Sequence, residues 1–167
     1  MKNKTDLRMY AKDLRKSLDI KLISEKLVSL IRQSAIYNNA KNVMIFYPKK
    51  YEVDLLDLLN DDKNFYLPKV SGEFLLVCPY SKDLVEAKFK IMEPCTDPVD
   101  PAILDLVIVP ALMCDKKGYR LGYGGGFYDR FLKSCQAKTM VAIPNELLID
   151  ELPFETYDIK IDEIIAK

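Results

Sequence analysis

The stretch DLVIVPALMCDKKGYRLGYGGGFYDRFL, residues 105–132, decides the expected fold. It opens with the apolar run DLVIV at 105–109, which predicts a strand buried on both faces of a sheet. A glycine-rich loop at 118–126 follows, and the residues after it predict a helix at about 127–135. A buried strand, a loop and a helix in this order are typical of an α/β protein.

The same alternation extends outward along the chain. The hydrophobic pattern predicts helices at 5–18, at 20–37 with Asp19 as its N-cap, and at 53–61. It predicts strands at 42–47, 64–67, 74–78, 138–143 and 161–165. Alternating strands and helices imply a mainly parallel sheet with helices on both faces. We expect residues 1–167 to form one domain.

Two further expectations concern the loops. Residues 79–104 are polar and rich in proline, and we interpret them as a long loop over the sheet edge, with a short strand at about 87–91, rather than as a linker. Ligands of parallel α/β sheets bind outside the carboxyl ends of the strands. This rule predicts that the loops after residues 47, 78 and 109 lie at the functional edge.

Composition excludes several kinds of catalysis and partner. The chain has 167 residues, with 25 Lys and Arg against 25 Asp and Glu, and no histidine. The absence of histidine removes Ser-His-Asp and Cys-His triads, histidine-ligated zinc and histidine general bases. Zero formal net charge argues against a protein that coats nucleic acid or anionic membrane. Residues 1–50 nevertheless hold 12 basic and 4 acidic residues, a pattern of either a solvated helix or a segment serving an anionic ligand.

The compartment is also suggested by sequence. The cysteines, Cys78, Cys95, Cys114 and Cys135, show no CxxC spacing, and a domain with a sufficient core does not need disulfides. The longest apolar run, Leu106–Cys114, is far shorter than the roughly 20 residues of a transmembrane helix. We therefore expect a reduced, cytoplasmic protein without a membrane or nucleic-acid partner, and a monomer rather than an oligomer.

The glycine loop is the strongest functional signal. Gly122 and Gly124–Gly126 are four of the six glycines, and Arg120 and Arg130 flank them. Glycines allow positive φ angles and let an anion approach the backbone N–H groups, and the following helix begins with free N–H groups. The spacing matches neither GxGxxG nor the Walker motif. We interpret the loop as a phosphate cradle, with a ligand-free tight turn as the alternative.

Several residues near the loop have two interpretations. Asp129 lies in the first turn of the expected helix, where an acid either stabilises the helix end or holds Mg²⁺ beside phosphates. Tyr123, Phe127 and Tyr128 either wall a planar ligand or fill the core. Lys4 and Arg8 lie one helical turn apart, so they either face one anion together or remain solvated.

The segment RLGYGGGFYDRFL at 120–132 closely resembles the signature of the 5-formyltetrahydrofolate cyclo-ligase family. Ordered matches cover nearly the whole chain. They are the Lys-x-x-Leu-Arg pattern at 4–8, YPKKYEVD at 47–54, IMEP at 91–94, LVIVPALMCDKKG at 106–118 and LPFETYDIKIDEII at 152–165. The resemblance implies a three-layer α/β/α sandwich with a mainly parallel central sheet. It also implies the ATP- and Mg²⁺-dependent conversion of 5-formyltetrahydrofolate to 5,10-methenyltetrahydrofolate.

The resemblance also implies roles for individual residues. ATP would contact Lys4, Arg8, Arg120, Leu121, Gly122, Tyr123, Gly124, Gly125, Gly126, Phe127 and Tyr128. The folate would contact Tyr47, Glu52 and Tyr123, with Tyr123 between folate and ATP. Mg²⁺ would be held by Asp129 and Asp158. Without the resemblance, Glu52 and Asp158 would be interpreted as surface acids.

The chain departs from the family pattern in three places. It reads PNELL at 144–148 where the family often has a glutamine, Gly125 where some members have lysine, and Tyr157 where many have a small polar residue or histidine. These departures leave open a second hypothesis, a relative that binds nucleotide or folate without turnover. A third hypothesis is a phosphotransferase with another acceptor.

Overall fold

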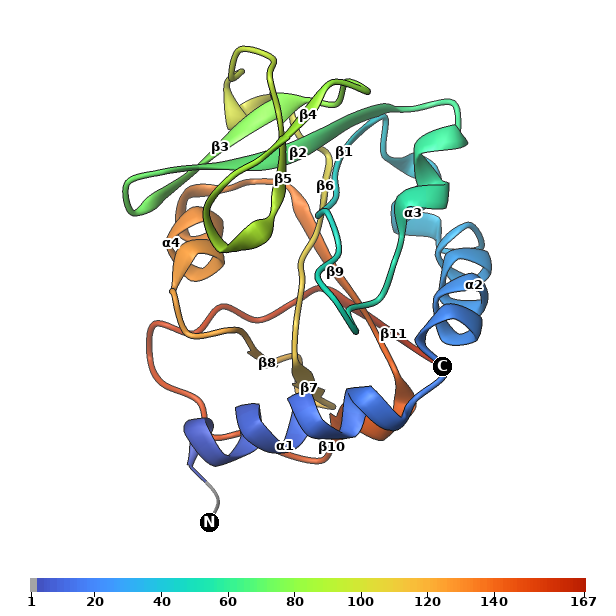
Figure 1. Ribbon diagram of the computed structural model, residues 1–167, viewed down its shortest axis with the longest axis vertical. Helices are drawn as coiled ribbons and strands as arrows, with labels where there is room; N and C mark the ends of the chain where they lie inside the picture. Colours follow the sequence, from blue (N-terminus) through green and yellow to red (C-terminus); the bar gives the residue numbers. More distant parts are fainter. Residues whose placement is uncertain (1–2) are drawn as a thin grey trace.

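The computed structural model describes residues 3–167 and contains a six-stranded, mainly parallel sheet (Figure 1). Neighbouring strands follow the order β11-β9-β6-β1-β2-β3. All neighbours are parallel except β2 and β3. The strands are β1 (Asn42–Met44), β2 (Asn64–Ser71), β3 (Phe74–Pro79), β6 (Leu106–Ile108), β9 (Lys138–Ile143) and β11 (Glu163–Ala166). The α/β class and the mainly parallel sheet agree with the sequence prediction.

The β2–β3 hairpin corrects one expectation about the functional edge. Because β3 runs antiparallel to β2, the loop after residue 78 lies at the amino ends of the parallel strands, away from the functional edge. The hairpin turn at Ser71–Phe74 lies at the carboxyl edge instead. β2 also continues through Pro68, where the sequence predicted an end. Its pairing with β1 stops at Tyr66, so the missing N–H of Pro68 breaks no bond to β1.

The described residues form four α-helices around the sheet: α1 (Lys4–Ser17), α2 (Ile20–Ile31), α3 (Ala35–Asn39) and α4 (Phe127–Ser134). The Asp19 side chain caps α2 by accepting from the N–H of Leu22, as expected. The helix predicted at 20–37 is in fact two helices, because Ser34 turns out of the helix and caps α3. No helix within residues 3–167 has both the length and the apolar character to cross a membrane.

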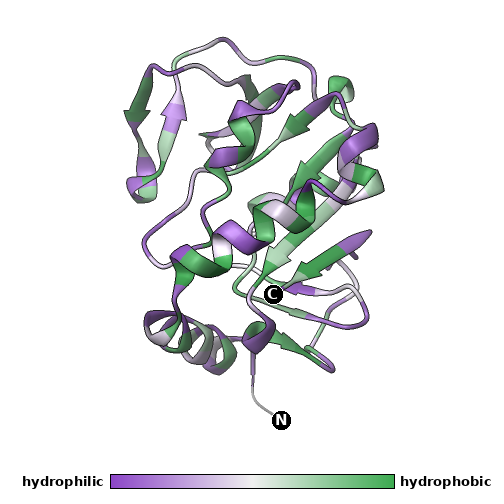
Figure 2. Ribbon diagram, turned by 90° about the vertical axis from the view of Figure 1, so that its right-hand side faces the viewer, coloured by the Kyte–Doolittle hydropathy of each residue, from purple (hydrophilic) through white to green (hydrophobic). Residues whose placement is uncertain are grey.

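The central strands bury alternate residues in two hydrophobic clusters. Val43, Leu106 and Met140 belong to a cluster with α2 and α3 residues such as Leu27 and Tyr37. Their neighbours Met44, Val107 and Val141 belong to a second cluster with Leu7 and Ala11 of α1 and Leu132 of α4. Figure 2 shows the strands as mostly hydrophobic and the helices as mixed. The sheet is thus apolar on both faces, which explains its weakly alternating sequence.

Shorter elements account for most differences from the sequence prediction. β7 (Met113–Asp115), β8 (Arg120–Leu121) and β10 (Leu148–Ile149) form a three-stranded sheet that was not predicted. The helix predicted at 53–61 is only the 3₁₀ helix η1 (Leu56–Asn60). The strand predicted at 87–91 is wrong: the 3₁₀ turn η2 (Lys88–Lys90) connects β4 (Leu84–Glu86) to β5 (Met92–Pro94). Two further 3₁₀ turns are η3 (Pro101–Ile103) and η4 (Asn145–Leu147).

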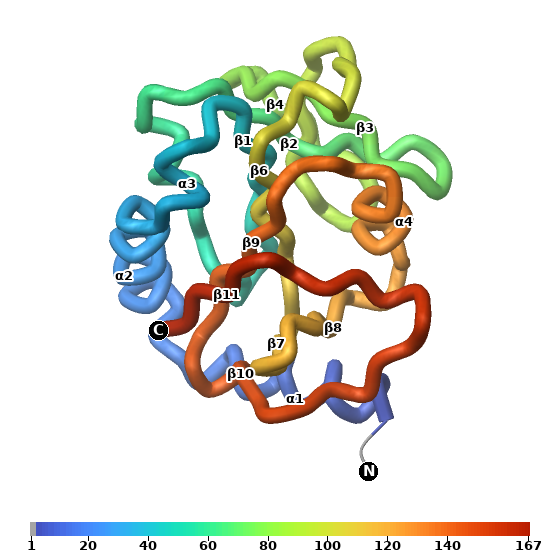
Figure 3. The backbone as a smooth tube through the Cα atoms, turned by 180° about the vertical axis from the view of Figure 1, so that it is seen from behind, coloured from blue at the N-terminus to red at the C-terminus, as the bar shows by residue number. Residues whose placement is uncertain are grey.

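The segment between β10 and β11 returns past α1. Figure 3 shows it running near the N-terminal half of α1 before it rejoins the sheet beside β9. Its Asp158 carboxylate accepts a 2.7 Å hydrogen bond from the Lys4 Nζ. The N-terminal part of α1 and residues 155–158 are thereby brought together beside the glycine loop.

Candidate functional site

A cavity of about 650 Å³ lies at the carboxyl ends of β1 and β6. Three residues shortly after these strands line it, as the rule for parallel sheets predicts: Phe46, Tyr47 and Pro110. The same cavity brings together every residue that the resemblance selected: Lys4, Arg8, Tyr47, Glu52, residues 120–129 and Asp158. Residues separated by up to 154 positions in sequence therefore share one site.

The glycine loop adopts a conformation that requires glycine at two positions. Gly124 has φ +105° and Gly126 has φ +69°, both in the region that side chains with a Cβ disfavour. Gly126 is the N-cap of α4 and supplies no side-chain cap. The first N–H groups of α4 therefore remain available to an anion, at the positive end of the helix dipole.

Basic side chains surround this loop. The Arg8 Nε donates a 2.9 Å hydrogen bond to the carbonyl of Gly122, so α1 and the loop are in direct contact. Arg120 has a side chain only 4% exposed, and its Nε has no hydrogen-bond partner within residues 3–167. Lys4 and Arg8 are partly buried rather than fully solvated. The arrangement provides a positively charged wall of the kind that binds phosphate groups.

The two candidate metal ligands differ in their partners. Asp129 receives a 3.1 Å hydrogen bond from Arg120 Nη2 on its Oδ1 atom. Gly126 rather than Asp129 is the N-cap of α4, so Asp129 can stabilise this helix end only through the helix dipole. Asp158 receives both Lys4 Nζ and the N–H of Glu155 on its Oδ2 atom. Lys4 and Asp158, expected to serve ATP and Mg²⁺, are thus ion-paired with each other.

Glu52 is buried, with 6% of its surface exposed, so the surface interpretation is wrong. Its carboxylate accepts hydrogen bonds from the N–H of Lys49 and from the Tyr123 hydroxyl, both at 2.8 Å. Burial raises the pKa of the Glu52 carboxyl, and these hydrogen bonds oppose the rise. Lys49 Nζ lies 4.3 Å from the centre of the Tyr123 ring. Tyr123 therefore connects the glycine loop to Glu52.

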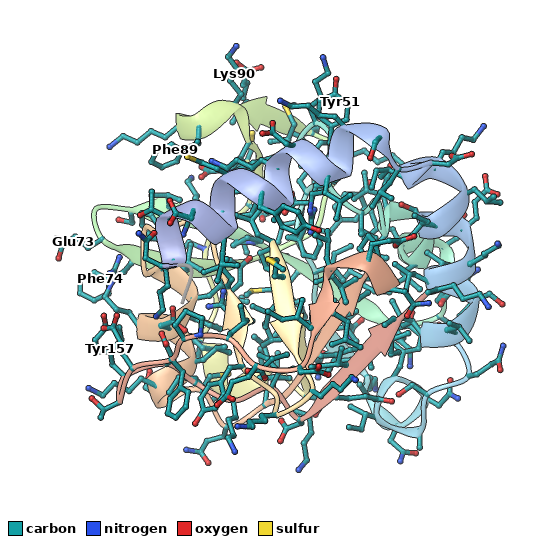
Figure 4. The ribbon with its side chains drawn as sticks, turned by 90° about the horizontal axis from the view of Figure 1, so that it is seen from below. Tyr51, Glu73, Phe74, Phe89, Lys90 and Tyr157 are labelled. Carbon is teal, nitrogen blue, oxygen red and sulfur yellow. The ribbon has the colours of Figure 1, made fainter. Side chains whose placement is uncertain are left out.

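Two aromatic residues, Tyr123 and Tyr128, fit both interpretations, since they fill the core and also form part of the cavity wall. Tyr123 and Tyr128 pack against the cluster that contains Leu121 and Leu132, and they also line the cavity. Phe127 faces Phe89 edge to face, with ring centres 6.4 Å apart. Figure 4 shows Phe89 and Tyr157 on opposite sides of the N-terminal half of α1. These aromatic side chains give the cavity an apolar part beside its basic part.

Sequence reasoning missed several cavity residues. Lys12, Lys49, Phe89 and Glu93 also line the cavity. Glu93 is 5% exposed and accepts a 2.9 Å hydrogen bond from the N–H of Val70. Glu93 and Lys49 lie inside the matched motifs IMEP and YPKKYEVD, so those matches held a signal for them. Phe89 had none, because its place depends on the turn between β4 and β5.

The three departures from the family pattern differ in whether they line the cavity. Gly125 and Tyr157 line the cavity, whereas none of residues 144–148 does. A Cβ added to Gly125 would lie 2.8 Å from the Phe127 ring, which accounts for a glycine here. The departure at 144–148, which motivated the hypothesis of binding without turnover, therefore does not alter the cavity wall.

Comparison with known proteins agrees with this geometry. The model of the 5-formyltetrahydrofolate cyclo-ligase family matches residues 3–167. The chain is 35% identical over 142 residues to the 5-formyltetrahydrofolate cyclo-ligase of Escherichia coli K12, covering 76% of this chain and 78% of that protein. It is 29% identical over 161 residues to the Haemophilus influenzae enzyme of that name, covering 86% and 83%.

A solved structure extends the likeness to three dimensions. The 5,10-methenyltetrahydrofolate synthetase of Aquifex aeolicus superposes with a TM-score of 0.87 at 31% identity, over 98% of this chain and 89% of that one. Sequence motifs, fold and the matching family model therefore lead to one conclusion: the chain belongs to the 5-formyltetrahydrofolate cyclo-ligase family.

Proposed function

We propose that this protein is an ATP-dependent 5-formyltetrahydrofolate cyclo-ligase, which forms 5,10-methenyltetrahydrofolate and releases ADP and phosphate. Family membership and the names of its relatives support the activity. The single observation that carries the proposal is the shared cavity. A glycine loop with a basic wall and a buried carboxylate beside aromatic rings line one space of about 650 Å³.

The chemistry suits a site without histidine. The γ-phosphoryl group passes from ATP to the formyl oxygen, and ADP leaves. N10 of the folate then attacks the formyl carbon, and the C–O bond breaks as phosphate departs. The N10 proton passes to water or to the phosphate. Phosphoryl transfer depends on positioning and on charge neutralisation, so no protein nucleophile is required.

The nucleotide would lie against the glycine loop and α1. Lys4, Arg8 and Arg120 would neutralise phosphate charge, and the backbone of residues 121–128 would supply N–H donors. The buried Nε of Arg120, which has no partner in the described part of the chain, supports this role because an unpaired buried donor is costly unless a ligand satisfies it.

The folate would lie on the other side of Tyr123. Glu52 would accept hydrogen bonds from pterin N–H groups, and Tyr47 would contact the same ligand. The support is the burial of Glu52 at the cavity wall and its bond to the Tyr123 hydroxyl. Tyr123 would then separate folate from ATP, at the point where the phosphoryl group crosses.

Mg²⁺ would be held by Asp129, with Asp158 as a second acidic partner. The donor set fits a hard cation that takes one or two carboxylates and fills its remaining positions with phosphate oxygens and water. Asp129 uses only its Oδ1 atom to bind Arg120, and its other oxygen accepts no hydrogen bond from residues 3–167. When bound, Mg²⁺ supplies charge neutralisation to the phosphates.

The remaining expectations form part of the same proposal. Two hydrophobic clusters separated by one sheet support a three-layer α/β/α sandwich, and contacts between distant segments support one domain over residues 1–167. The four free cysteines are compatible with a reduced, cytoplasmic protein. A monomer would suffice, because one chain lines the whole cavity.

The activity is tested by mixing folded protein with 5-formyltetrahydrofolate and MgATP and recording the absorbance of the methenyl product. We expect the product to appear together with ADP. Ligand-induced stabilisation without ADP release would instead support a binding protein. ADP release without the methenyl product would support a phosphotransferase with another acceptor.

A further inference from the structure

Arg15 is a buried cation whose place in the site was not anticipated. It lies on α1 and is only 3% exposed, which is unusual for a charged side chain. Its Nη2 atom donates to the carbonyls of Ala111 and Leu112, and its Nη1 atom donates to the carbonyl of Tyr51 at 3.5 Å. Arg15 therefore ties α1 to the two loops that follow β1 and β6.

The contact with Tyr51 falls on a strained backbone. Tyr51 has φ +64°, a left-handed conformation that is unfavourable for a residue with a Cβ. The residue is 41% exposed, so its ring is not part of the buried core. Figure 4 shows Tyr51 beside the C-terminal half of α1, where Arg15 lies. The next residue, Glu52, directs its carboxylate to Tyr123 at the cavity wall.

Arg15 is one of the charged groups that lie near the Glu52 carboxylate. Glu52 has no ion pair within residues 3–167, and its neighbours are Lys49 of the same loop, Tyr123 of the glycine loop and Tyr128 of α4. Arg15 in turn has only carbonyl partners in the described chain and cannot lose its charge. A buried cation and a buried anion without other ion-pair partners thus occupy the same region. The field of Arg15 lowers the pKa of the Glu52 carboxyl and opposes the rise that burial causes.

We infer that Arg15 is a positioning residue for the folate subsite: it holds the Tyr51–Glu52 turn in place and supplies a fixed positive charge near the Glu52 carboxylate. Arg15 does not line the cavity and so acts through Glu52. The inference rests on the proposed role of Glu52 in binding folate. It places a determinant of folate affinity on α1, the helix from which Lys4 and Arg8 are proposed to contact the nucleotide.

The test compares Arg15→Met and Arg15→Lys with the unchanged protein. Binding of 5-formyltetrahydrofolate and of a non-hydrolysable ATP analogue is measured separately by calorimetry, from about pH 5 to about pH 8. For Arg15→Met we expect a folate Kd about tenfold higher and an ATP-analogue Kd within about twofold of the original. The acid limb of folate binding should move to higher pH, because loss of the cation raises the Glu52 pKa.

Arg15→Lys separates charge from geometry. An ammonium keeps the charge but cannot serve carbonyls in several directions as a guanidinium does. We expect its acid limb to stay near that of the unchanged protein, while its folate Kd still rises. Adding Tyr51→Gly should recover part of the lost folate affinity, because glycine adopts the left-handed turn without strain.

Arg32→Met is the matched control. Arg32 binds Asp57 and Asp61 outside the cavity, so its loss should lower thermal stability and leave both ligand affinities unchanged. Equal weakening of folate and ATP binding in both Arg15 variants, or no weakening of either, would overturn the inference. If Arg15→Met does not fold, Arg15→Lys tests the inference alone: the inference holds only if this variant weakens folate binding more than binding of the ATP analogue.

Glu52→Gln distinguishes this inference from the proposed function. If Glu52→Gln leaves folate affinity unchanged, the proposed folate subsite is wrong. If Glu52→Gln weakens folate binding and the Arg15 variants do not, only the role of Arg15 is wrong.

Discussion

Asp129 shows how one residue can be tested for two roles. Asparagine keeps an oxygen that can accept from Arg120 but loses the charge that Mg²⁺ requires. We expect Asp129→Asn to lower Mg²⁺-dependent turnover by at least about tenfold. Its melting temperature should change by less than about 3 °C, because the side chain does not cap α4.

Turnover is recorded against Mg²⁺ concentration, and thermal unfolding is followed in parallel. A variant that loses stability as strongly as turnover would support a role for Asp129 at the helix dipole instead. Restored turnover at high Mg²⁺ concentration would further support weakened metal binding.

Gly124 offers a second residue-scale test with an internal control. Its φ of +105° disfavours any side chain, and an added Cβ would lie 3.6 Å from Arg8 Cζ. Gly72 has φ +59° at the hairpin turn, with nothing within 4 Å of an added Cβ. Both Gly→Ala substitutions should cost about 1 kcal/mol of stability, because both impose a disfavoured φ. Only Gly124→Ala should also weaken binding of the ATP analogue.

Calorimetric titration of the two variants separates the effects. Equal affinity for the ATP analogue in Gly124→Ala and Gly72→Ala would argue that the backbone of the glycine loop does not receive phosphate.

At the scale of elements, Asp105 connects the starts of β1 and β6. Its Oδ2 atom accepts from the N–H groups of Lys41 and Asn42, at 2.9 and 2.8 Å. The bond from Asn42 is the main reason that the pKa of Asp105 lies below its ordinary value. The ionised form therefore stabilises the fold above the unfolded-state pKa of about 4, and this contribution disappears as pH falls through the lower folded-state value.

We expect Asp105→Asn to be less stable than the unchanged protein by about 1 kcal/mol at neutral pH, since the group is exposed. The difference should shrink toward zero in acid below both pKa values. Denaturant unfolding at neutral and acid pH measures it. Glu86→Gln, at an exposed position on β4, is the control, and a difference that persists unchanged in acid would contradict the assignment.

Helices and strands were predictable from the sequence where the local residue pattern agrees with the tertiary packing. α1, α4, β6 and β9 follow from apolar runs, caps and glycines, and their bounds differ little from expectation. β7, β8 and β10 have two or three residues each and exist because they pair with one another. No local pattern specifies such pairing, because it depends on segments distant in sequence.

The site residues likewise divide into those indicated by local sequence and those that depend on distant segments. The glycine loop was evident from local sequence, since positive φ angles such as those of Gly124 and Gly126 favour glycine. From local sequence alone, four site residues would be interpreted as surface residues: Lys4, Arg8, Glu52 and Asp158. Only the ordered set of family motifs assigned them to the site. The burial of Arg15 was not predictable, because its partners are backbone carbonyl groups, whose positions a pattern of side chains does not indicate.

For the whole molecule, the zero net charge conceals an organised distribution. The basic N-terminal segment supplies Lys4, Arg8 and Lys12 to the cavity, and acidic residues of later segments, Glu52, Asp129 and Asp158, face them. Opposite charges thus meet in the cavity rather than cancelling over the surface. Such an arrangement suits a site for an anionic nucleotide and its cation, and it leaves no strongly basic whole-molecule field for nucleic acid.

This organisation predicts that the two ligands influence each other through Tyr123. Its hydroxyl binds Glu52 at 2.8 Å, and its backbone belongs to the glycine loop, so one residue joins the proposed folate and ATP subsites. If folate binding fixes this residue, the loop is ordered in advance for the nucleotide. Each ligand should then raise the affinity of the other by the same factor, because coupling free energies are reciprocal.

Tyr123→Phe keeps the ring and removes only the hydroxyl, so it should reduce this coupling while each ligand alone still binds. The measurement is the Kd of the ATP analogue with and without saturating 5-formyltetrahydrofolate, and the converse titration. We expect coupling of about fivefold or more in the unchanged protein and a value closer to one in the variant. Tyr47→Phe, which removes a cavity hydroxyl outside the glycine loop, should leave the coupling in place. Unchanged coupling in Tyr123→Phe would mean that the ligands communicate through direct contact with each other, because the protein path would then be broken.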